Sequence, residues 1–329
     1  MRIDIHTHFV CVDFIKHLQG RSSYPSSVLE GGTYFTNCGP GFRTPVLPKV
    51  VDLEVKLRDV AEMNVDVSVL SHAVPGPEVL GGEDADYWAS RINDHLAGLI
   101  ADYPDQFLGF GSVGFGSAER SIAEVDRCIN ELGFKGIQVF SNINQKVLDS
   151  PEFKPVFQHV ARLGIPMNMH PAIPMNLAGM DSGSLATGLG FMYDTSLNTV
   201  RLIQSGLFDE LPDLKLIVPH IGGIMPYLQG RLERVNEPAL RSVTYQPELQ
   251  HPFGHYLRML YYDSVTYHPE ALDYFYRLMG AEHLLFGSDH PFGQPYSLVA
   301  EMVEQLDCAP AEKEMIYHGN AEKLLGITG

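Results

Sequence analysis

The chain has 329 residues, room for one large domain or two ordinary ones, and its 45% hydrophobic and 19% charged residues are typical of a globular protein. Its formal net charge of −17 disfavours nucleic acid and anionic membranes as partners, because both require a basic face. No apolar run approaches the roughly 18 residues of a membrane span, and no signal peptide precedes the first strand-like segment. The four cysteines are scattered, which is typical of free thiols in a reducing compartment. We therefore expect a soluble, cytoplasmic protein.

The first nine residues, MRIDIHTHF, alternate as a short buried strand does. Side chains two residues apart on a strand share a face, so His6 and His8 are expected to project together from its C-terminal end. Two imidazoles that converge in this way can fill two positions around a metal. Such a pair also arises by chance, so its meaning depends on residues further along the chain.

Two long Gly/Pro-rich stretches, 10–50 and 171–192, do not have the pattern of core elements. The first is too long for a simple connection, which indicates a lid, a small insertion or disorder. The second is expected to be a loop over a functional site. Both are expected to shape a pocket, but neither carries a residue pattern that identifies a substrate.

The rest of the chain alternates between strand and helix patterns. The expected strands cover residues 1–9, 65–72, 107–113, 136–142, 165–170, 215–223, 260–265 and 283–289. The expected helices cover residues 52–63, 84–102, 117–132, 151–163, 194–206, 224–235, 269–279, 296–306 and 310–325. Residues 236–258 are ambiguous.

Eight strands that alternate with helices predict the α/β class and a parallel sheet, and eight such units close naturally into a (β/α)8 TIM barrel. We expect one domain over residues 1–329, with an insertion at 10–50 near the mouth of the barrel and a helical extension at the C-terminus. An open doubly wound sheet is the alternative. No G-x-G-x-x-G or P-loop pattern follows any expected strand, so nothing marks a nucleotide site.

Barrel enzymes carry their chemistry at the C-terminal ends of the strands. Five residues that can bind metal or transfer protons fall at such ends: His6, His8, His170, His220 and Asp289. Each also has a simpler interpretation. His170 could be a hydrogen-bonded core histidine, and Asp289 could be a turn residue before a proline-containing segment.

Five segments, in order along nearly the whole chain, resemble one family. They are IDIHTH (3–8), MNMHP (167–171), PHIGGIMPYLQGR (219–231), FGSDHPFG (286–293) and HGNAEKLLG (318–326). With them the sequence resembles the amidohydrolase superfamily, and within it the branch that contains aminocarboxymuconate semialdehyde decarboxylase and the aromatic-acid decarboxylases.

The resemblance implies that His6, His8, His170 and Asp289 bind one divalent metal and leave a position for water. Zinc is the expected ion, with manganese as the alternative. Nitrogen and oxygen ligands of this kind suit zinc, and an open coordination position distinguishes a catalytic zinc site from a structural one.

The resemblance also implies roles for residues outside the ligand set. His220 corresponds to the catalytic base, although it could instead be a fifth ligand or a structural donor, and Asp289 can take part in proton transfer. Arg231 corresponds to an arginine that reaches a substrate carboxylate in its own or a neighbouring subunit. If it reaches into a neighbouring subunit, the protein must be a homodimer or larger oligomer. The alternative is that Arg231 is a solvent-exposed helix arginine without a functional role. Arg43 is a looser match to a second such arginine, and His290 has no assigned role.

The sequence indicates the type of reaction less directly than it indicates the metal site. Hydrolytic relatives often hold two metals bridged by a lysine or glutamate at the mouth of the fourth strand, whereas Lys135 lies at the opposite end of segment 136–142. One metal is therefore expected. Our first hypothesis is non-oxidative decarboxylation of a carboxylated muconate semialdehyde or hydroxylated aromatic acid, a small-molecule carboxylic acid. Hydrolysis of an amide or lactone, hydration of an oxo-diacid, and metal binding without catalysis are the alternatives.

Overall fold

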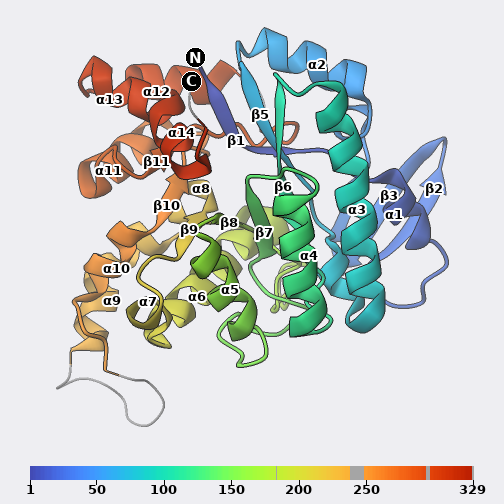
Figure 1. Ribbon diagram of the computed structural model, residues 1–329, viewed down its shortest axis with the longest axis horizontal. Coiled ribbons are helices and arrows are strands. Elements are labelled where there is room, and N and C mark those ends of the chain that lie inside the picture. The colour runs from blue at the N-terminus through green and yellow to red at the C-terminus, as the bar shows by residue number, and fades with distance from the viewer. Residues whose placement is uncertain (183, 238–247, 294–296, 328–329) are drawn as a thin grey trace.

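The computed structural model describes residues 1–182, 184–237, 248–293 and 297–327, and its centre is a sheet of eight parallel strands (Figure 1). The strands, in their order around the sheet, are β1 (Ile3–His8), β5 (Val67–Ser71), β6 (Phe107–Ser112), β7 (Gly136–Phe140), β8 (Pro166–His170), β9 (Lys215–Val218), β10 (Tyr261–Asp263) and β11 (Leu284–Leu285). The N–H of Ile5 donates to the carbonyl of Phe286 at 2.9 Å, and that of His8 donates to the carbonyl of His290 at 2.8 Å. These bonds join the two ends of the sheet, so the predicted (β/α)8 barrel is confirmed.

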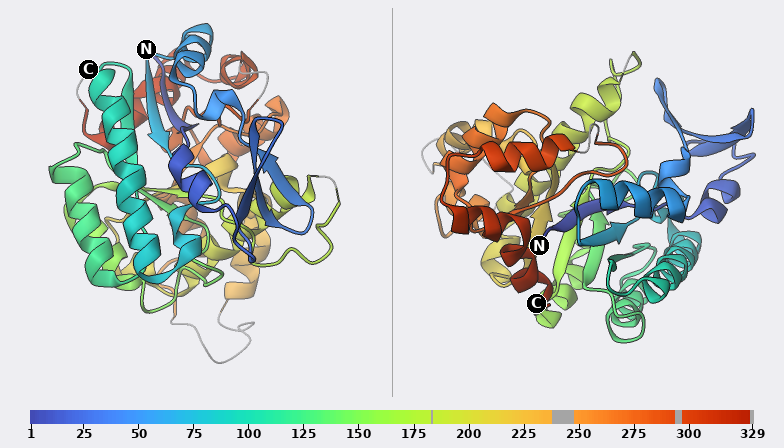
Figure 2. Two further views of the ribbon diagram at one scale, coloured as in Figure 1. Left: turned by 90° about the vertical axis from the view of Figure 1, so that its right-hand side faces the viewer. Right: turned by 90° about the horizontal axis from the view of Figure 1, so that it is seen from above.

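Helices surround the barrel (Figures 1 and 2). They are α2 (Leu53–Glu62), α3 (Gly82–Asp102), α4 (Ala118–Asn130), α5 (Lys154–Leu163), α6 (Phe191–Gln204), α7 (Leu207–Glu210), α8 (Pro219–Gly222), α9 (Met225–Asn236), α10 (Phe253–Met259), α11 (Pro269–Met279), α12 (Ser297–Gln305), α13 (Pro310–Glu314) and α14 (Asn320–Leu325). The Asp52 side chain caps α2 by accepting hydrogen bonds from the N–H groups of Glu54 and Val55, which fixes where this helix begins. Within the described residues, none of the helices combines the length and the apolar character needed to cross a bilayer.

Several predicted boundaries were wrong. The strand predicted over 215–223 ends at Val218, because the chain turns at Pro219 and both His220 and Ile221 adopt left-handed backbones (φ 56° and 49°). The last strand is regular over two residues, and the chain then bends where Asp289 adopts a left-handed backbone (φ 56°). α6 begins at Phe191, inside the stretch predicted as loop, and a π-helical turn, Met315–Gly319, interrupts the helix predicted over 310–325. Within the ambiguous stretch 236–258, residues 238–247 lie outside the described residues.

The stretch 10–50 is an ordered insertion. It contains α1 (Val12–His17) and an antiparallel sheet of β2 (Ser26–Glu30), β3 (Thr33–Gly39) and β4 (Phe42–Pro45), which lies beside the barrel (Figure 2). Cys38 and Phe42 of this sheet pack in one apolar cluster with Ile173 and Ala186. The two Gly/Pro-rich stretches therefore contact each other next to the loops that follow the strands.

The N-terminal half of the barrel is filled with apolar side chains. Ile3 and Ile5 share a cluster with residues of β5, β6, β9 and β11, and α14 adds Ala321, Leu324 and Leu325 to it. The C-terminal extension thus packs on the end of the barrel where both chain termini lie (Figure 1). The opposite end, where the strands finish, is left for polar residues.

Candidate metal centre

Three histidines meet where β1 and β8 end. The ring centroids of His6 and His8 lie 4.9 Å apart, and that of His170 lies 4.7 Å from His8. One nitrogen from each ring can be chosen so that all three lie within 4.8 Å of one another. All three side chains are buried. Rings on two strands far apart in sequence therefore converge as the strand-end rule predicts.

Asp289 and His220 complete the group. Asp289 Oδ1 lies 3.5 Å from His6 Nε2 and 3.4 Å from His8 Nε2, and Asp289 Oδ2 lies 3.9 Å from His220 Nε2. Ligand atoms of His6, His220 and Asp289 also fall within 4.8 Å of one another. The structure therefore brings all five predicted strand-end residues together, and distance alone does not separate His220 from the metal ligands.

Hydrogen bonds on the far side of each ring turn the Nε2 atoms inward. His6 Nδ1 bonds Asp263 Oδ2 at 2.6 Å, His8 Nδ1 bonds the Ser71 hydroxyl at 3.1 Å, and His170 Nδ1 bonds the Pro171 carbonyl at 2.8 Å. The Nε2 atoms of His6 and His8 are buried and have no hydrogen-bond partner among the described residues. Buried polar atoms are seldom left unpaired. Orphaned imidazole nitrogens beside a carboxylate fit a divalent metal, and histidine ligands typically bond a carboxylate or carbonyl on their other side.

The protonation states of these residues suit metal binding. Burial lowers the pKa of His8 to about 4 and holds that of His170 well below its ordinary value. Burial also acts to lower the pKa of His6, but the carboxylates of Asp263, Asp289 and Asp4 together outweigh it and raise that pKa to about 9. Burial opposes ionisation of Asp289, yet the neighbouring imidazoles of His220, His8 and His6 hold its pKa well below the usual range. Asp289 is therefore anionic and His8 and His170 are neutral, whereas a metal must compete with a proton on His6.

The strand-end group lies beside a cavity of about 810 Å³, within the range of small-molecule sites. His220 and Asp289 line it, together with the aromatic rings of Phe42, Phe191 and Phe292. Phe42 belongs to the insertion, so the insertion forms part of the cavity wall. A flat apolar ring that carries a polar substituent matches this combination of aromatic and charged groups.

Comparison with known proteins decides the family, because the amidohydrolase model matches residues 3–327. The chain belongs to the amidohydrolase family. The 2-amino-3-carboxymuconate-6-semialdehyde decarboxylase of Dictyostelium discoideum is 29% identical over 99% of this chain and 92% of that protein. The gamma-resorcylate decarboxylase of Polaromonas sp. is 29% identical over 88% of this chain and 90% of that protein. The structure of a 5-carboxyvanillate decarboxylase from Novosphingobium aromaticivorans, complexed with manganese and a nitrobenzoic acid, has a TM-score of 0.83 and 26% identity and covers 99% of this chain and 96% of its own.

In this amidohydrolase the predicted arginines lie apart. Arg43 lines the large cavity, bonds Glu30 Oε2 at 2.5 Å and places its guanidinium 4.3 Å from the centre of the Phe35 ring. Arg231 is exposed on α9 and does not line that cavity. Arg43 can therefore reach a ligand of its own chain's cavity, whereas Arg231 faces solvent in the single chain.

A buried lysine behind the centre was not predicted. The amino group of Lys56, on α2, is fully buried; it bonds the Thr7 hydroxyl and lies 2.8 Å from His290 Nδ1. His290 Nε2 bonds Asp59 Oδ2 at 3.1 Å. Burial lowers the pKa of Lys56 to about 7, although Asp4 and Asp59 oppose this shift. Thr7 lies between the candidate ligands His6 and His8, and His290 follows the candidate ligand Asp289. Lys56 therefore ties α2 to both segments that carry these ligands.

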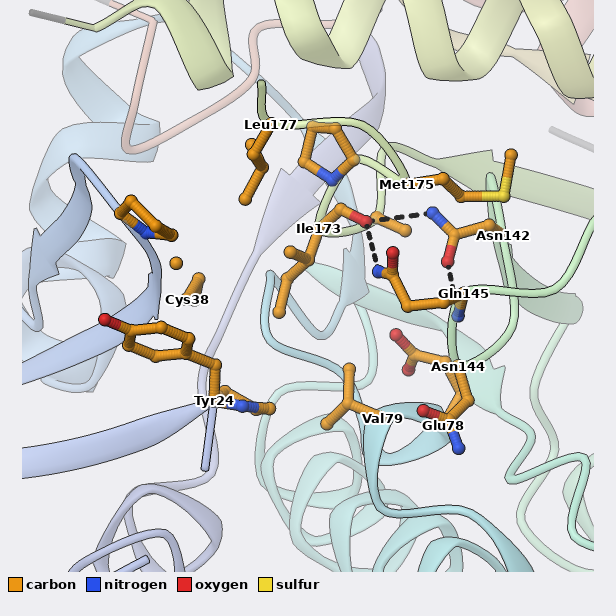
Figure 3. Close-up of a pocket in the computed structure, with 15 residues that line it drawn as sticks. Tyr24, Cys38, Glu78, Val79, Asn142, Asn144, Gln145, Ile173, Met175 and Leu177 are labelled. Carbon is orange, nitrogen blue, oxygen red and sulfur yellow. Dashed lines mark hydrogen bonds between the residues drawn. The ribbon is translucent and has the colours of Figure 1, made fainter. Parts of the chain in front are cut away.

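A second cavity, of about 240 Å³, lies between the insertion and the loops after β5, β7 and β8 (Figure 3). The side-chain amides of Asn142 and Gln145 donate to the Ile173 carbonyl at 2.9 and 3.2 Å. None of the five strand-end residues lines this cavity. Glu78 does line it, and its Oε2 is buried with no hydrogen-bond partner among the described residues.

Glu78 is expected to make stability depend on pH. Burial raises its pKa from 4.5 to about 8, although a hydrogen bond from its own backbone N–H opposes the shift. Between these values the folded state keeps a proton that the unfolded state has lost, so Glu78 contributes stability below pH 4.5 that disappears as pH rises through about 8. Glu78→Gln removes this loss. The free energy of unfolding of the variant relative to wild type should therefore rise with pH, by at most about 1.4 kcal/mol per pH unit.

Urea unfolding of both proteins from pH 5 to 9 measures this difference. Glu119→Gln, which changes an exposed carboxylate on α4, is the matched control and should show no trend. A difference between Glu78→Gln and wild type that stays constant across the range would show that Glu78 is ionised in the folded protein.

Proposed function

We propose that this amidohydrolase is a metal-dependent, non-oxidative decarboxylase of a hydroxylated aromatic acid or a carboxylated muconate semialdehyde. The observation that carries the proposal is the convergence of four histidines and Asp289 beside a cavity walled by aromatic rings. The decarboxylases that match nearly the whole chain support the reaction class. Hydrolysis of an amide or lactone, and hydration of an oxo-diacid, are the alternatives that the test must separate.

The metal is proposed to bind to His6, His8, His170 and Asp289. Zinc is our first choice because three imidazoles and one carboxylate are ordinary zinc ligands. Manganese, which the carboxyvanillate decarboxylase structure holds, is the alternative. β7 ends at Phe140, whose ring packs against His170, so no lysine or glutamate occupies the mouth of this strand to bridge a second ion. We therefore propose one metal per chain.

The bound metal would supply a positive charge that polarises the substrate carboxylate and the oxygen beside it. The side chains of the protein are proposed to transfer the proton and to stabilise the charges. His220, at the cavity wall, is proposed to deliver a proton to the carbon that carries the carboxylate. That proton forms the new C–H bond with an electron pair of the substrate's conjugated system. The bond to the carboxylate then breaks, its electron pair returns to the conjugated system, carbon dioxide leaves, and His220 is left neutral. Asp289, 3.9 Å from His220 Nε2, can stabilise the protonated imidazole before the transfer.

Arg43 is proposed to bind a substrate oxygen by exchanging its Glu30 partner for the ligand, because a planar guanidinium binds carboxylate through two N–H groups. Arg231, exposed on α9, is proposed to reach the cavity of a second subunit, which makes the enzyme a homodimer or larger oligomer. We further propose a cytoplasmic location, because all four cysteines are free.

The deciding experiment measures product from a panel of compounds. The purified protein, loaded with zinc or manganese, is incubated with dihydroxybenzoates, carboxyvanillate and carboxymuconate semialdehyde, and separately with amides, lactones and an unsaturated oxo-diacid. We expect carbon dioxide in a one-to-one ratio with the acid consumed, no hydrolysis, and about one metal per chain by elemental analysis.

Hydrolysis or hydration without carbon dioxide would overturn the proposed reaction and leave the metal site standing. Two metals per chain would overturn the mononuclear site. Protein that retains no divalent metal after dialysis against zinc would overturn both.

A further inference from the structure

The two carboxylate oxygens of Asp289 face different surroundings. Oδ1 faces the Nε2 atoms of His6 and His8, at 3.5 and 3.4 Å. Oδ2 accepts a hydrogen bond from the hydroxyl of Tyr267 at 2.8 Å. A carboxylate can rotate about its bond to Cβ, so a donor on one oxygen decides which way the other points. The Tyr267 hydroxyl therefore fixes the direction of Oδ1.

The backbone at Tyr267, which makes this contact, is in an unfavourable conformation. Its φ is +59°, in the left-handed region that a bulky side chain seldom adopts. Such outliers are costly to the folded state and concentrate at functional sites. Asp289, its partner, also has a positive φ, of 56°. Both ends of the hydrogen bond are therefore set by unusual backbone rather than by regular secondary structure.

The chain also leaves room for the ring. Gly293 lies beside Tyr267: an added Cβ would come within 2.2 Å of the Ser288 carbonyl oxygen and within 3.1 Å of both Cε1 and Oη of the tyrosine. Tyr267 lines the large cavity, so its ring is also part of the wall of the binding site. A side chain at position 293 would therefore crowd the phenol that bonds Asp289.

We propose that Tyr267 is a positioning residue, whose hydroxyl holds Asp289 with Oδ1 toward His6 and His8, where it would serve as a metal ligand, and with Oδ2 on the cavity side. This inference rests on the proposed metal site. Partners that orient a ligand in this way typically contribute a factor of about 10–100 in metal affinity. Tyr267 makes its contribution through Asp289.

The test is Tyr267→Phe, which removes one oxygen and keeps the ring that fills the cavity wall. Metal-free protein is titrated with zinc in competition with a chromogenic chelator, and the rate at which EDTA removes bound zinc is measured separately. We expect the dissociation constant and the removal rate to rise about 10- to 100-fold. The removal rate reports on folded, loaded protein, so partial loss of folded protein would not affect it.

Tyr276→Phe is the matched control, because the Tyr276 hydroxyl also bonds a carboxylate, Glu312 Oε1 at 3.1 Å, on the outer helices. It should leave both values within twofold of wild type. Asp289→Asn is measured beside it as the variant that removes the anionic ligand itself.

The outcomes separate this inference from the proposed function. If Tyr267→Phe binds and releases zinc like wild type while Asp289→Asn does not retain it, the metal site stands and the role of Tyr267 is overturned. If Tyr276→Phe loses affinity as Tyr267→Phe does, the effect is general and the inference is also overturned. If wild type binds no zinc, the proposed metal site and this inference fall together.

Discussion

Replacing His170 with alanine is expected to release the metal and to reduce decarboxylation to background. His170 is 5% exposed, its ring centroid is 4.7 Å from that of His8, and its Nδ1 is occupied by the Pro171 carbonyl, so Nε2 is the nitrogen left for a metal. Loss of one of four ligands leaves too few donors for tight binding. Elemental analysis after gel filtration should give less than about 0.1 metal per chain, against about one for wild type.

His159→Ala is the control for this experiment. His159 bonds Asp126 Oδ1 at 2.7 Å on the outer helices, away from the strand ends, so its loss should leave metal content and turnover unchanged. Retention of a full equivalent of metal by His170→Ala would contradict the proposed ligand set and would return His170 to the role of a core histidine.

The five strand-end residues could be predicted because parallel strands place their C-terminal ends at one edge. An approximate position for each strand is enough to place the residue at its end near the residues at the ends of the other strands, even where the predicted bounds are wrong. The prediction therefore tolerated errors in the elements themselves. The strand at 215–223 ends five residues early, yet His220 still lies at the mouth of the barrel.

The residues that hold these five were harder to predict, because their roles depend on contacts between distant segments. Asp263 ends β10 and bonds His6, 257 positions away, but one acidic residue after a strand has no distinctive pattern. Lys56 does carry a signal in the sequence. It lies at helical spacing from Leu53 and Val60, on the apolar face of α2, where a lysine is buried only when it finds partners.

Backbone irregularities were beyond the sequence patterns. The pairing of β1 with β5 shifts by one residue between Asp4 and Thr7, so Ile5 joins the apolar interior while His6 next to it joins the metal centre. A strict alternation would place these neighbours on opposite faces. The left-handed conformation of Tyr267 likewise has no signal in residue type, because a bulky aromatic residue seldom adopts it.

His220→Asn is expected to lower turnover by about 10²- to 10⁴-fold while the metal is retained. Asparagine suits the position because His220 has a φ of 56°, and asparagine is among the residues that tolerate the left-handed region. In the wild type the backbone N–H of His220 donates to Asp263 Oδ1 at 2.8 Å, and asparagine keeps this N–H. Asp263 should therefore stay in place and keep its hydrogen bond with His6 Nδ1. What is lost is an imidazole that can carry a proton to the substrate.

The measurement pairs the rate of carbon dioxide release with metal content on the same sample, which separates the two roles that geometry leaves open for His220. A catalytic proton donor predicts about one metal per chain and little turnover. Equal loss of metal in His220→Asn and His170→Ala would make His220 a fifth ligand, in agreement with its place in the second group of ligand atoms within 4.8 Å. Unchanged turnover would remove His220 from the reaction and leave Asp289 as the group in contact with the cavity that could transfer the proton.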